Sequence, residues 1–215
     1  MQRRAFFTTT GSLALGAAFL PPGLAQANAP RAGTDFLVLN RPAPVETPAD
    51  KIEVIEFFWY NCPHCNSFEP VLSEWVKKLP KDVVFKRVPV AFSDSFVPQQ
   101  RLFYALEALG LTEQLHARVF AAIHGEKQNL SQGAAIVDWV VKHGIDRARF
   151  TEQFNSFSVS TKATRATQLQ TAYQVEGVPA LGIAGRYYTD GALAQNMDRV
   201  LQVADYLTDQ IRRTR

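Results

Sequence analysis

Cysteine is scarce in this chain, since Cys62 and Cys65 are the only two among 215 residues. A fold held by several structural disulfides is therefore excluded. A disulfide between residues so close in the sequence would constrain the unfolded chain very little. A zinc site is an alternative, but zinc usually takes four ligands, and His116, His124 and His143 show no ligand spacing. The pair is more typical of a redox-active dithiol.

An excess of either charge and a long hydrophobic run are also missing. Lys and Arg number 23 against 20 Asp and Glu, which gives a net charge of +3. Such a balance offers no electrostatic argument for a nucleic acid or an anionic membrane as partner. The apolar run at residues 13–20 is too short to span a bilayer. Internal repeats and low-complexity tracts are absent from the sequence.

The N-terminus has the pattern of an export signal. Arg3 and Arg4 precede the short apolar run, and alanines at alternate positions predict cleavage near Ala27 or Ala29. A retained anchor is the alternative. The paired arginines also resemble a twin-arginine signal, so the sequence leaves the Sec and twin-arginine routes open. They are the only charged residues before Ala29, so the net charge falls from +3 to +1 once they are removed.

The two cysteines lie where a predicted strand meets a predicted helix. Residues 51–60 are rich in β-branched and aromatic side chains, and apolar residues recur with helical period in residues 67–78. Pro63 suits the first helical position, which needs no N–H donor. A thiol at the start of a helix meets unpaired N–H groups and the positive end of the helix dipole, which favour the thiolate. We therefore expect Cys62 to be the attacking sulfur.

His64 and Cys65, which follow Cys62, suggest whether the pair acts as an oxidant or a reductant. Cys65 lies one turn into the helix and is predicted to be the inner, resolving cysteine. His64, if cationic, adds a charge that favours the Cys62 thiolate. A stabilised thiolate favours the dithiol form, which makes the disulfide an oxidant.

The pattern along the chain predicts an α/β fold with a helical interruption. A β-α-β unit ends near residue 90, and its two strands are expected to be buried and parallel. A β-hairpin at residues 180–189 and an amphipathic helix at residues 196–212 end the chain. Thr112, Ser131 and Asp146 are candidate helix caps. The helices predicted between these two parts cover residues 99–109, 112–125, 131–144, 146–154 and 158–174.

Several motifs together resemble the DsbA family of bacterial periplasmic thiol:disulfide oxidoreductases. They are Glu56-Phe57-Phe58, Cys62-Pro63-His64-Cys65, Phe68-Glu69 and Gly177-Val178-Pro179. The resemblance covers essentially the whole chain after the signal and implies a thioredoxin fold with an inserted all-helical domain. The expected boundaries are 1–29 for the signal peptide, 34–95 and 175–215 for the thioredoxin-like domain, and 96–174 for the inserted domain.

The resemblance also implies roles for residues outside the dithiol. Val178 and Pro179 match the family's cis-proline loop, which offers its backbone to a bound substrate strand. Glu56 stands on an otherwise apolar strand, where burial would raise the pKa of its carboxyl. It matches the family's buried acid, which assists proton transfer at Cys65; a solvent-facing Glu56 is the alternative. The predicted catalytic residues are therefore Cys62, Pro63, His64, Cys65 and Glu56. Glu69 with Lys86 or Arg87 suggests a charged cluster or an ordinary surface pair.

The expected function is donation of the Cys62–Cys65 disulfide to newly exported proteins in the periplasm. The expected partners are unfolded or reduced exported proteins and, for reoxidation, an inner-membrane quinone reductase of the DsbB type. We expect a monomer with no organic cofactor, no metal and no nucleic acid. A reductase or isomerase of the same fold remains an alternative, although isomerases usually carry a dimerisation domain for which residues 30–50 leave no room. A copper carrier using Cys62, His64 and Cys65 is another.

Overall fold

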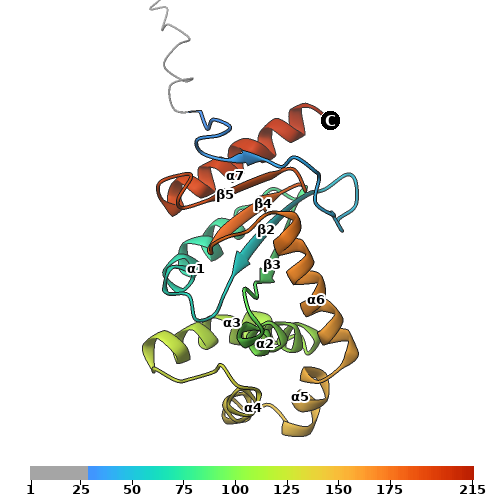
Figure 1. The fold of residues 1–215 in the computed structure, drawn as a ribbon, viewed down its shortest axis with the longest axis vertical. Helices are drawn as coiled ribbons and strands as arrows, with labels where there is room; N and C mark the ends of the chain where they lie inside the picture. The colour runs from blue at the N-terminus through green and yellow to red at the C-terminus, as the bar shows by residue number, and fades with distance from the viewer. Residues whose placement is uncertain (1–28) are drawn as a thin grey trace, which may run out of the picture.

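The computed structural model describes residues 29–215, so almost all of the predicted signal peptide lies outside the described residues. Its centre is a five-stranded mixed sheet in the order β1-β5-β4-β2-β3 (Figure 1). Strands β2 and β3 are parallel, and the other pairs are antiparallel. The strands are β1 (Leu37–Val38), β2 (Ile52–Phe58), β3 (Val83–Pro89), β4 (Ala180–Ile183) and β5 (Tyr187–Asp190). The predicted β-α-β unit and β-hairpin are both present.

Two helices cover one face of the sheet, and the helical insertion lies below its other face in Figure 1. The covering helices are α1 (Pro63–Val76) and α7 (Met197–Arg213). Between β3 and β4 the described chain forms no strand. The insertion contains α2 (Val97–Ala108), α3 (Thr112–Phe120), α4 (Gly133–Lys142), α5 (Arg147–Phe154) and α6 (Phe157–Ala172).

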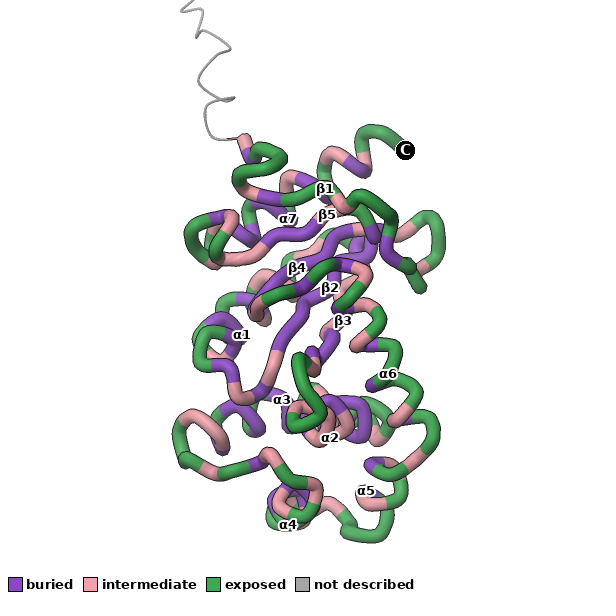
Figure 2. The backbone as a smooth tube through the Cα atoms, in the orientation of Figure 1, coloured by how far each residue is buried: buried purple, intermediate pink, exposed green. Residues whose placement is uncertain are grey.

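The alternation of side chains along β2 divides the core in two. Ile52 and Val54 pack with α1 and α7, whereas Ile55 and Phe57 pack with the insertion. Every residue of β2 is buried (Figure 2). Because this central strand runs directly into the cysteine motif, the motif is anchored to the most buried part of the sheet.

Three local predictions were wrong. Strand β3 is an edge strand whose four middle residues are only half-buried, because β2 covers it on one side alone. Thr112 is the first residue of α3 rather than its cap, because Gly110, with a φ of 71° in the left-handed region, reverses the chain shortly before it. Ser131 does not cap α4, which begins two residues later, and its N–H instead bonds to Asn129. Asp146 does cap α5.

Within residues 29–215, no helix is both long enough and apolar enough to cross a membrane.

Candidate active site

The cysteine motif forms the first turn of α1. Cys62 is the N-cap, Pro63 is at the start of the helix, and the Cys62 sulfur accepts the backbone N–H of Cys65 at 3.4 Å. Both cysteines are free thiols in this structure. The Cys62 residue is 7% exposed and Cys65 is 0% exposed, so Cys62 is the outer sulfur as predicted.

The surroundings drive the acidities of the two thiols apart. A hydrogen bond from the Cys65 thiol lowers the pKa of Cys62 to about 6. Burial works against this decrease. The backbone N–H groups of Cys65 and His64 and the charge of His64 add to it. Burial, followed by the hydrogen bond and charge of Cys62, raises the pKa of Cys65 far above its ordinary value. At pH 7 the reduced site therefore holds a thiolate at Cys62 and a thiol at Cys65. The charge of exposed His64 contributes less to this than the Cys65 thiol and the backbone.

The Val178–Pro179 loop lies directly beside the outer sulfur. Its peptide bond is cis, and the Val178 carbonyl oxygen lies 3.3 Å from the Cys62 sulfur, which can donate to it only when protonated. A cavity of about 430 Å³ opens next to this contact. Its lining consists of His64, the loop Gly177, Val178 and Pro179, and five residues from the end of β5 to the start of α7: Asp190, Gly191, Ala192, Gln195 and Met197. The structure thus brings His64 and both predicted substrate-binding residues to one groove at the cysteines.

Glu56 is buried on β2, as its apolar neighbours in the sequence predict. It is 1% exposed and stands opposite Arg87 in the β2–β3 register, with Oε2 at 3.2 Å from Arg87 Nε. Neither atom makes a well-aligned hydrogen bond. Burial raises the pKa of Glu56 to about 8 against the opposing charge of Arg87, and the charge of Glu69 adds to the rise. The charge of Glu56 in turn contributes to the raised pKa of Cys65, so the two groups interact.

Arg87 holds a second buried carboxylate, which sequence reasoning left outside the catalytic set. Its Nη2 atom lies 2.8 Å from Glu69 Oε1, and Ser73 donates to the same oxygen at 2.6 Å. Lys86 points to the other face of the sheet, because side chains alternate along a strand, and pairs there with Glu53. The charged pair is therefore Glu69 with Arg87, and it is buried rather than on the surface.

His116 completes this cluster from α3 and was not predicted. It lies between Tyr60 and Glu69, although 46 or more residues separate it from either in the sequence. The signal available in the sequence was its position among the apolar residues Leu115, Val119 and Phe120, because a polar residue on the apolar side of a helix is normally buried with partners.

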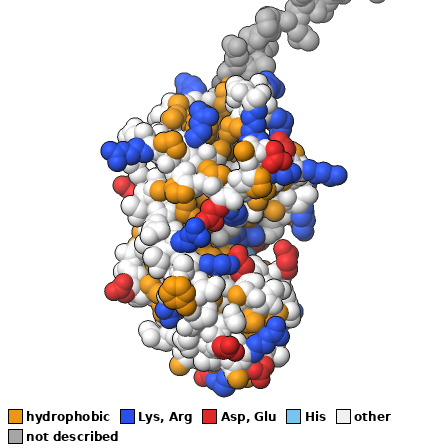
Figure 3. All heavy atoms as spheres, turned by 90° about the vertical axis from the view of Figure 1, so that its right-hand side faces the viewer, with side chains coloured by type: hydrophobic (Ala, Val, Ile, Leu, Met, Phe, Trp, Pro, Cys, Tyr) orange, Lys and Arg blue, Asp and Glu red, His pale blue; other side chains and the backbone are white. Residues whose placement is uncertain are grey.

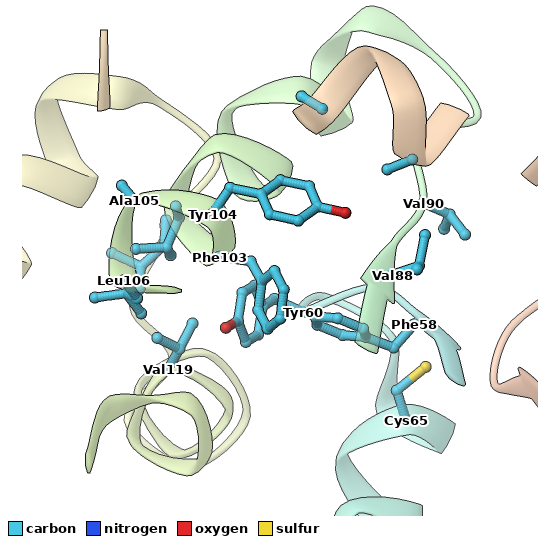
Figure 4. Packing of buried hydrophobic residues seen from close by; sticks show 14 of the residues in the cluster. Phe58, Tyr60, Cys65, Val88, Val90, Phe103, Tyr104, Ala105, Leu106 and Val119 are labelled. Carbon is cyan, nitrogen blue, oxygen red and sulfur yellow. The ribbon is translucent and has the colours of Figure 1, made fainter. Parts of the chain in front are cut away.

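An aromatic wall separates the cysteines from the helical insertion. Figure 4 shows the Phe58 ring between Cys65 and the rings of Tyr60 and Phe103. The ring centre of Phe58 is 5.1 Å from that of Tyr60 and 5.4 Å from that of Phe103. This packing keeps water from the inner thiol and strengthens the electrostatic interactions around it.

A second cavity, of about 410 Å³, lies away from the cysteines, between the β2–β3 edge and helices α2 and α6. Its cations have acidic partners, including Lys162 with Glu107 and Arg165 with Glu46. Side chains of both charges are mixed over the face of the molecule in Figure 3. In residues 29–215, no group of three or more His, Cys, Asp or Glu side chains is placed to hold a metal ion.

Comparison with known proteins gives a consistent assignment. Residues 53–207 match the family model described as "DSBA-like thioredoxin domain". The thiol:disulfide interchange protein DsbA of Burkholderia cepacia is 44% identical over 194 residues, which are 89% of this chain and 92% of the relative. That of Bordetella pertussis is 42% identical over 214 residues, 99% of this chain and 100% of the relative.

The fold gives the same result. The crystal structure of Pseudomonas aeruginosa DsbA aligns with a TM-score of 0.81 at 38% identity, covering 86% of this chain and 95% of the other. That of DsbA from Xylella fastidiosa aligns with a TM-score of 0.79 at 30% identity, covering 85% and 98%. With a dithiol at a helix start, a cis-proline loop beside it and a matching sequence throughout, the chain belongs to the DsbA family and is a thiol:disulfide oxidoreductase with a thioredoxin fold and a helical insertion.

Proposed function

We propose that this protein is an oxidant that donates a Cys62–Cys65 disulfide to newly exported proteins. The observation that carries the proposal is the difference between the two thiols: the pKa of Cys62 is lowered to about 6, whereas that of buried Cys65 is raised. A stabilised Cys62 thiolate makes the reduced form more favourable. The disulfide is therefore readily given away.

The reaction has two exchange steps. A substrate thiolate attacks the Cys62 sulfur, the Cys62–Cys65 bond breaks, and its electron pair goes to the Cys65 sulfur. A second substrate thiolate then attacks the substrate sulfur of this mixed disulfide and releases Cys62 as a thiolate. The substrate loses two electrons and forms its disulfide, and the protein gains them as a dithiol. Cys62 is an effective leaving group because its thiolate is stable.

Glu56 supplies the proton that the first step needs. Release of Cys65 as a thiolate in a buried site is costly, and a neighbouring carboxylic acid can protonate it. With a pKa of about 8, Glu56 holds a proton at pH 7 in the reduced structure. Pro63 begins the helix that carries both thiols, and His64 adds a smaller electrostatic contribution to the Cys62 thiolate.

The groove beside Cys62 binds the substrate chain. Val178 and Pro179 contribute backbone to it, and the Val178 carbonyl lies within 3.3 Å of the reacting sulfur. An extended polypeptide can pair with such a backbone regardless of its sequence, which suits a protein with many unfolded substrates. Reduced or unfolded exported proteins are therefore the proposed substrates.

The proposed setting is the periplasm, reached after cleavage of the signal near Ala27 or Ala29. A monomer would be reoxidised there by an inner-membrane quinone reductase of the DsbB type. Residues 34–95 and 175–215 are the proposed thioredoxin-like domain, and residues 96–174 are the proposed inserted domain. Hydrogen exchange on the whole chain should show two groups of amides with boundaries near these positions.

Two measurements test the proposal. Equilibration with mixtures of reduced and oxidised glutathione should give a potential well above that of a thioredoxin-like reductant. Cys65→Ser, challenged with an oxidised peptide, should accumulate a mixed disulfide at Cys62, whereas Cys62→Ser should form none. A thioredoxin-like potential would replace the oxidant role with a reductase role. Trapping at Cys65 instead would reverse the assignment of the two sulfurs.

A further inference from the structure

Helix α3 contributes one buried polar side chain, His116, that has no role in the proposed disulfide exchange. His116 is 4% exposed, and the rings of Phe58, Phe120 and Phe103 lie around it with centres at 5.1, 5.3 and 5.9 Å. An imidazole in such surroundings costs free energy unless its nitrogens have partners. Nδ1 lies 2.9 Å from the Tyr60 hydroxyl, and Nε2 lies 3.4 Å from Glu69 Oε2.

These contacts define the state of the ring. Burial raises the pKa of Tyr60 well above its ordinary value, so its hydroxyl keeps its proton and can donate to Nδ1. Burial also lowers the pKa of His116, which favours a neutral ring. A neutral ring that accepts at Nδ1 carries its own proton on Nε2, facing Glu69. Among the described residues, neither Nε2 nor Glu69 Oε2 makes a well-aligned hydrogen bond, with each other or with any other group. At 3.4 Å each is the other's available partner, and a small shift aligns the two.

The cluster holds two carboxyl groups around one permanent cation. Arg87 contacts Glu56 at 3.2 Å and Glu69 at 2.8 Å. Two ionised carboxylates would leave a buried negative charge without a partner, so one carboxyl keeps a proton near neutral pH. The groups that face this cluster from the surrounding elements are Cys65 and Ser73 on α1, Tyr60 after β2, and His116 with the more distant Glu113 on α3.

The surroundings of the two carboxyls are unequal. Glu69 receives the Ser73 hydroxyl at 2.6 Å and faces the His116 N–H, in addition to Arg87. Within residues 29–215, the ion pair of the Glu56 carboxyl is with Arg87 alone. More donors favour the ionised form, so Glu69 is the carboxylate and Glu56 is the acid.

We propose that His116 is a positioning residue that sets which of the two buried carboxyl groups keeps the proton, and directs it to Glu56 beside Cys65. The inference rests on the proposed role of Glu56 as proton donor. It gives the helical insertion a part in the reaction, because α3 supplies the side chain that makes the choice.

The consequence of losing this donor follows from the two protonation states of the pair. The His116 N–H stabilises every state in which Glu69 is ionised. Without it, the pKa of Glu69 rises by about one pH unit, since a hydrogen bond to a charged group has roughly that strength. The preference of the proton for Glu56 over Glu69 then falls about tenfold. The pH at which the Glu56–Glu69 pair releases its last proton stays the same or rises. The quantity that falls is the fraction of molecules in which Glu56 carries that proton.

Three variants test the proposal. His116→Leu removes the donor, whereas His116→Gln can place an amide N–H close to the position of Nε2. His143→Gln is the matched control, because His143 bonds to the Trp139 carbonyl within α4, outside the cluster. Two readouts are needed: the carboxyl ¹³C titration of Glu69 in the reduced protein, and the rate at which a small dithiol opens the disulfide of the oxidised protein between pH 5 and 9.

We expect His116→Leu to raise the titration of Glu69 by about one pH unit and to slow opening at pH 6 to 7 by less than tenfold, because the preference of the proton for Glu56 over Glu69 falls about tenfold at most. His116→Gln should restore both toward wild type, and His143→Gln should change neither. If His116→Leu does not fold, Tyr60→Phe should shift both readouts in the same direction, because Nδ1 then loses its donor. Wild-type behaviour of His116→Leu, or equal impairment of His116→Gln, overturns the proposal.

The same data separate this inference from the role of Glu56. If Glu56→Gln opens its disulfide with a wild-type pH profile, Glu56 is not the proton donor. The Glu69 titration still reports whether His116 holds that carboxyl in its ionised form. A titration unchanged in His116→Leu therefore rejects the inference on its own, whatever the rates show.

Discussion

Strand β2 buries two glutamates, three residues apart and on opposite faces of the sheet, with different surroundings. Glu53 is 2% exposed and accepts from its own cation, Lys86, at 2.7 Å and from the backbone N–H of Glu46 at 3.3 Å. Lys86 reaches toward solvent, with 34% of its side chain exposed. Glu56 is 1% exposed and shares the half-buried Arg87 with Glu69.

This difference shows that burial alone does not make a carboxyl group useful as an acid. Glu53 has a cation of its own, Lys86, and lies at the edge of a cavity. Glu56 shares its only cation with Glu69, so the effect of burial exceeds the attraction of Arg87 and raises the pKa of Glu56 to about 8. The sharing of one guanidinium by two carboxyls is thus the feature that produces a weak acid beside Cys65.

The largest expected effect comes from removing the shared cation. Arg87→Met leaves two buried carboxyls without their shared cation and should reduce the free energy of unfolding by about 3 to 5 kcal/mol. Lys86→Met is the matched change on the other face and should cost about 1 kcal/mol, because the Lys86 side chain is 34% exposed, against 16% for Arg87. Urea denaturation of both variants measures this. Equal losses would show that the two ion pairs do not differ in the way described.

The next effect is on the pH dependence of stability. The pKa of Glu56 is raised in the folded state, from an ordinary value of 4.5 to about 8. The folded protein therefore binds more protons than the unfolded chain between these values. The contribution of Glu56 is fully present below pH 4.5 and is lost as the pH rises through 8, a change on the order of 5 kcal/mol.

Glu56→Gln should lack this loss, so its stability relative to wild type should rise from pH 5 to 8. Glu53→Gln is the control and should not reproduce that trend. Urea denaturation of the reduced proteins at a series of pH values gives the comparison. A parallel course for wild type and Glu56→Gln would mean that Glu56 is ionised in the folded state.

A kinetic effect of about tenfold should also distinguish the two glutamates. Glu56→Gln cannot donate a proton to Cys65, so opening of the oxidised disulfide by a thiol should slow roughly tenfold at pH 7, which is less than the usual contribution of general acid catalysis. The wild-type decline above pH 8 should disappear with it. Stopped-flow measurements at constant thiolate concentration isolate this step. Comparable slowing in Glu53→Gln would point to an indirect effect on the strand.

The smallest effect is expected at His64, an exposed residue outside both the Glu53–Lys86 ion pair and the cluster of Glu56, Arg87 and Glu69. His64→Ser removes a charge that favours the Cys62 thiolate, so the reduction potential should become more negative. The Cys65 thiol and the backbone N–H groups remain, which limits the change to roughly tenfold or less in the glutathione equilibrium constant. Glutathione equilibration of both proteins measures it. An unchanged or more oxidising potential would remove His64 from the proposed site.

Local patterns in the sequence predicted the parts of the site that depend on near neighbours. The β-branched residues before Cys62 and the helical period after it placed the thiol at a helix start, and Pro63 agreed with both. The apolar residues around Glu56 predicted its burial. The assignment of Val178–Pro179 as a cis bond came from family resemblance rather than from the residues themselves, and it is confirmed.

The cluster below the thiols could not be read in the same way. Whether Glu69 pairs with Lys86 or Arg87 depends on which side of β3 faces α1, and sequence alone did not define the register of β3 against β2. The place of His116 depends on how α3 packs against the sheet. Such contacts join segments far apart in the chain, so no local pattern reports them.

The amino-acid sequence by itself therefore determined the reacting groups: two thiols one helical turn apart, a proline that starts the helix, and an acid on a buried strand. Only the tertiary structure decided their acidities. A pKa depends on burial and on the charges within a few ångströms, and here these come from β3, α1 and α3 together. Arg87 and His116 acquire their relation to Glu56 only when those elements pack around one buried site.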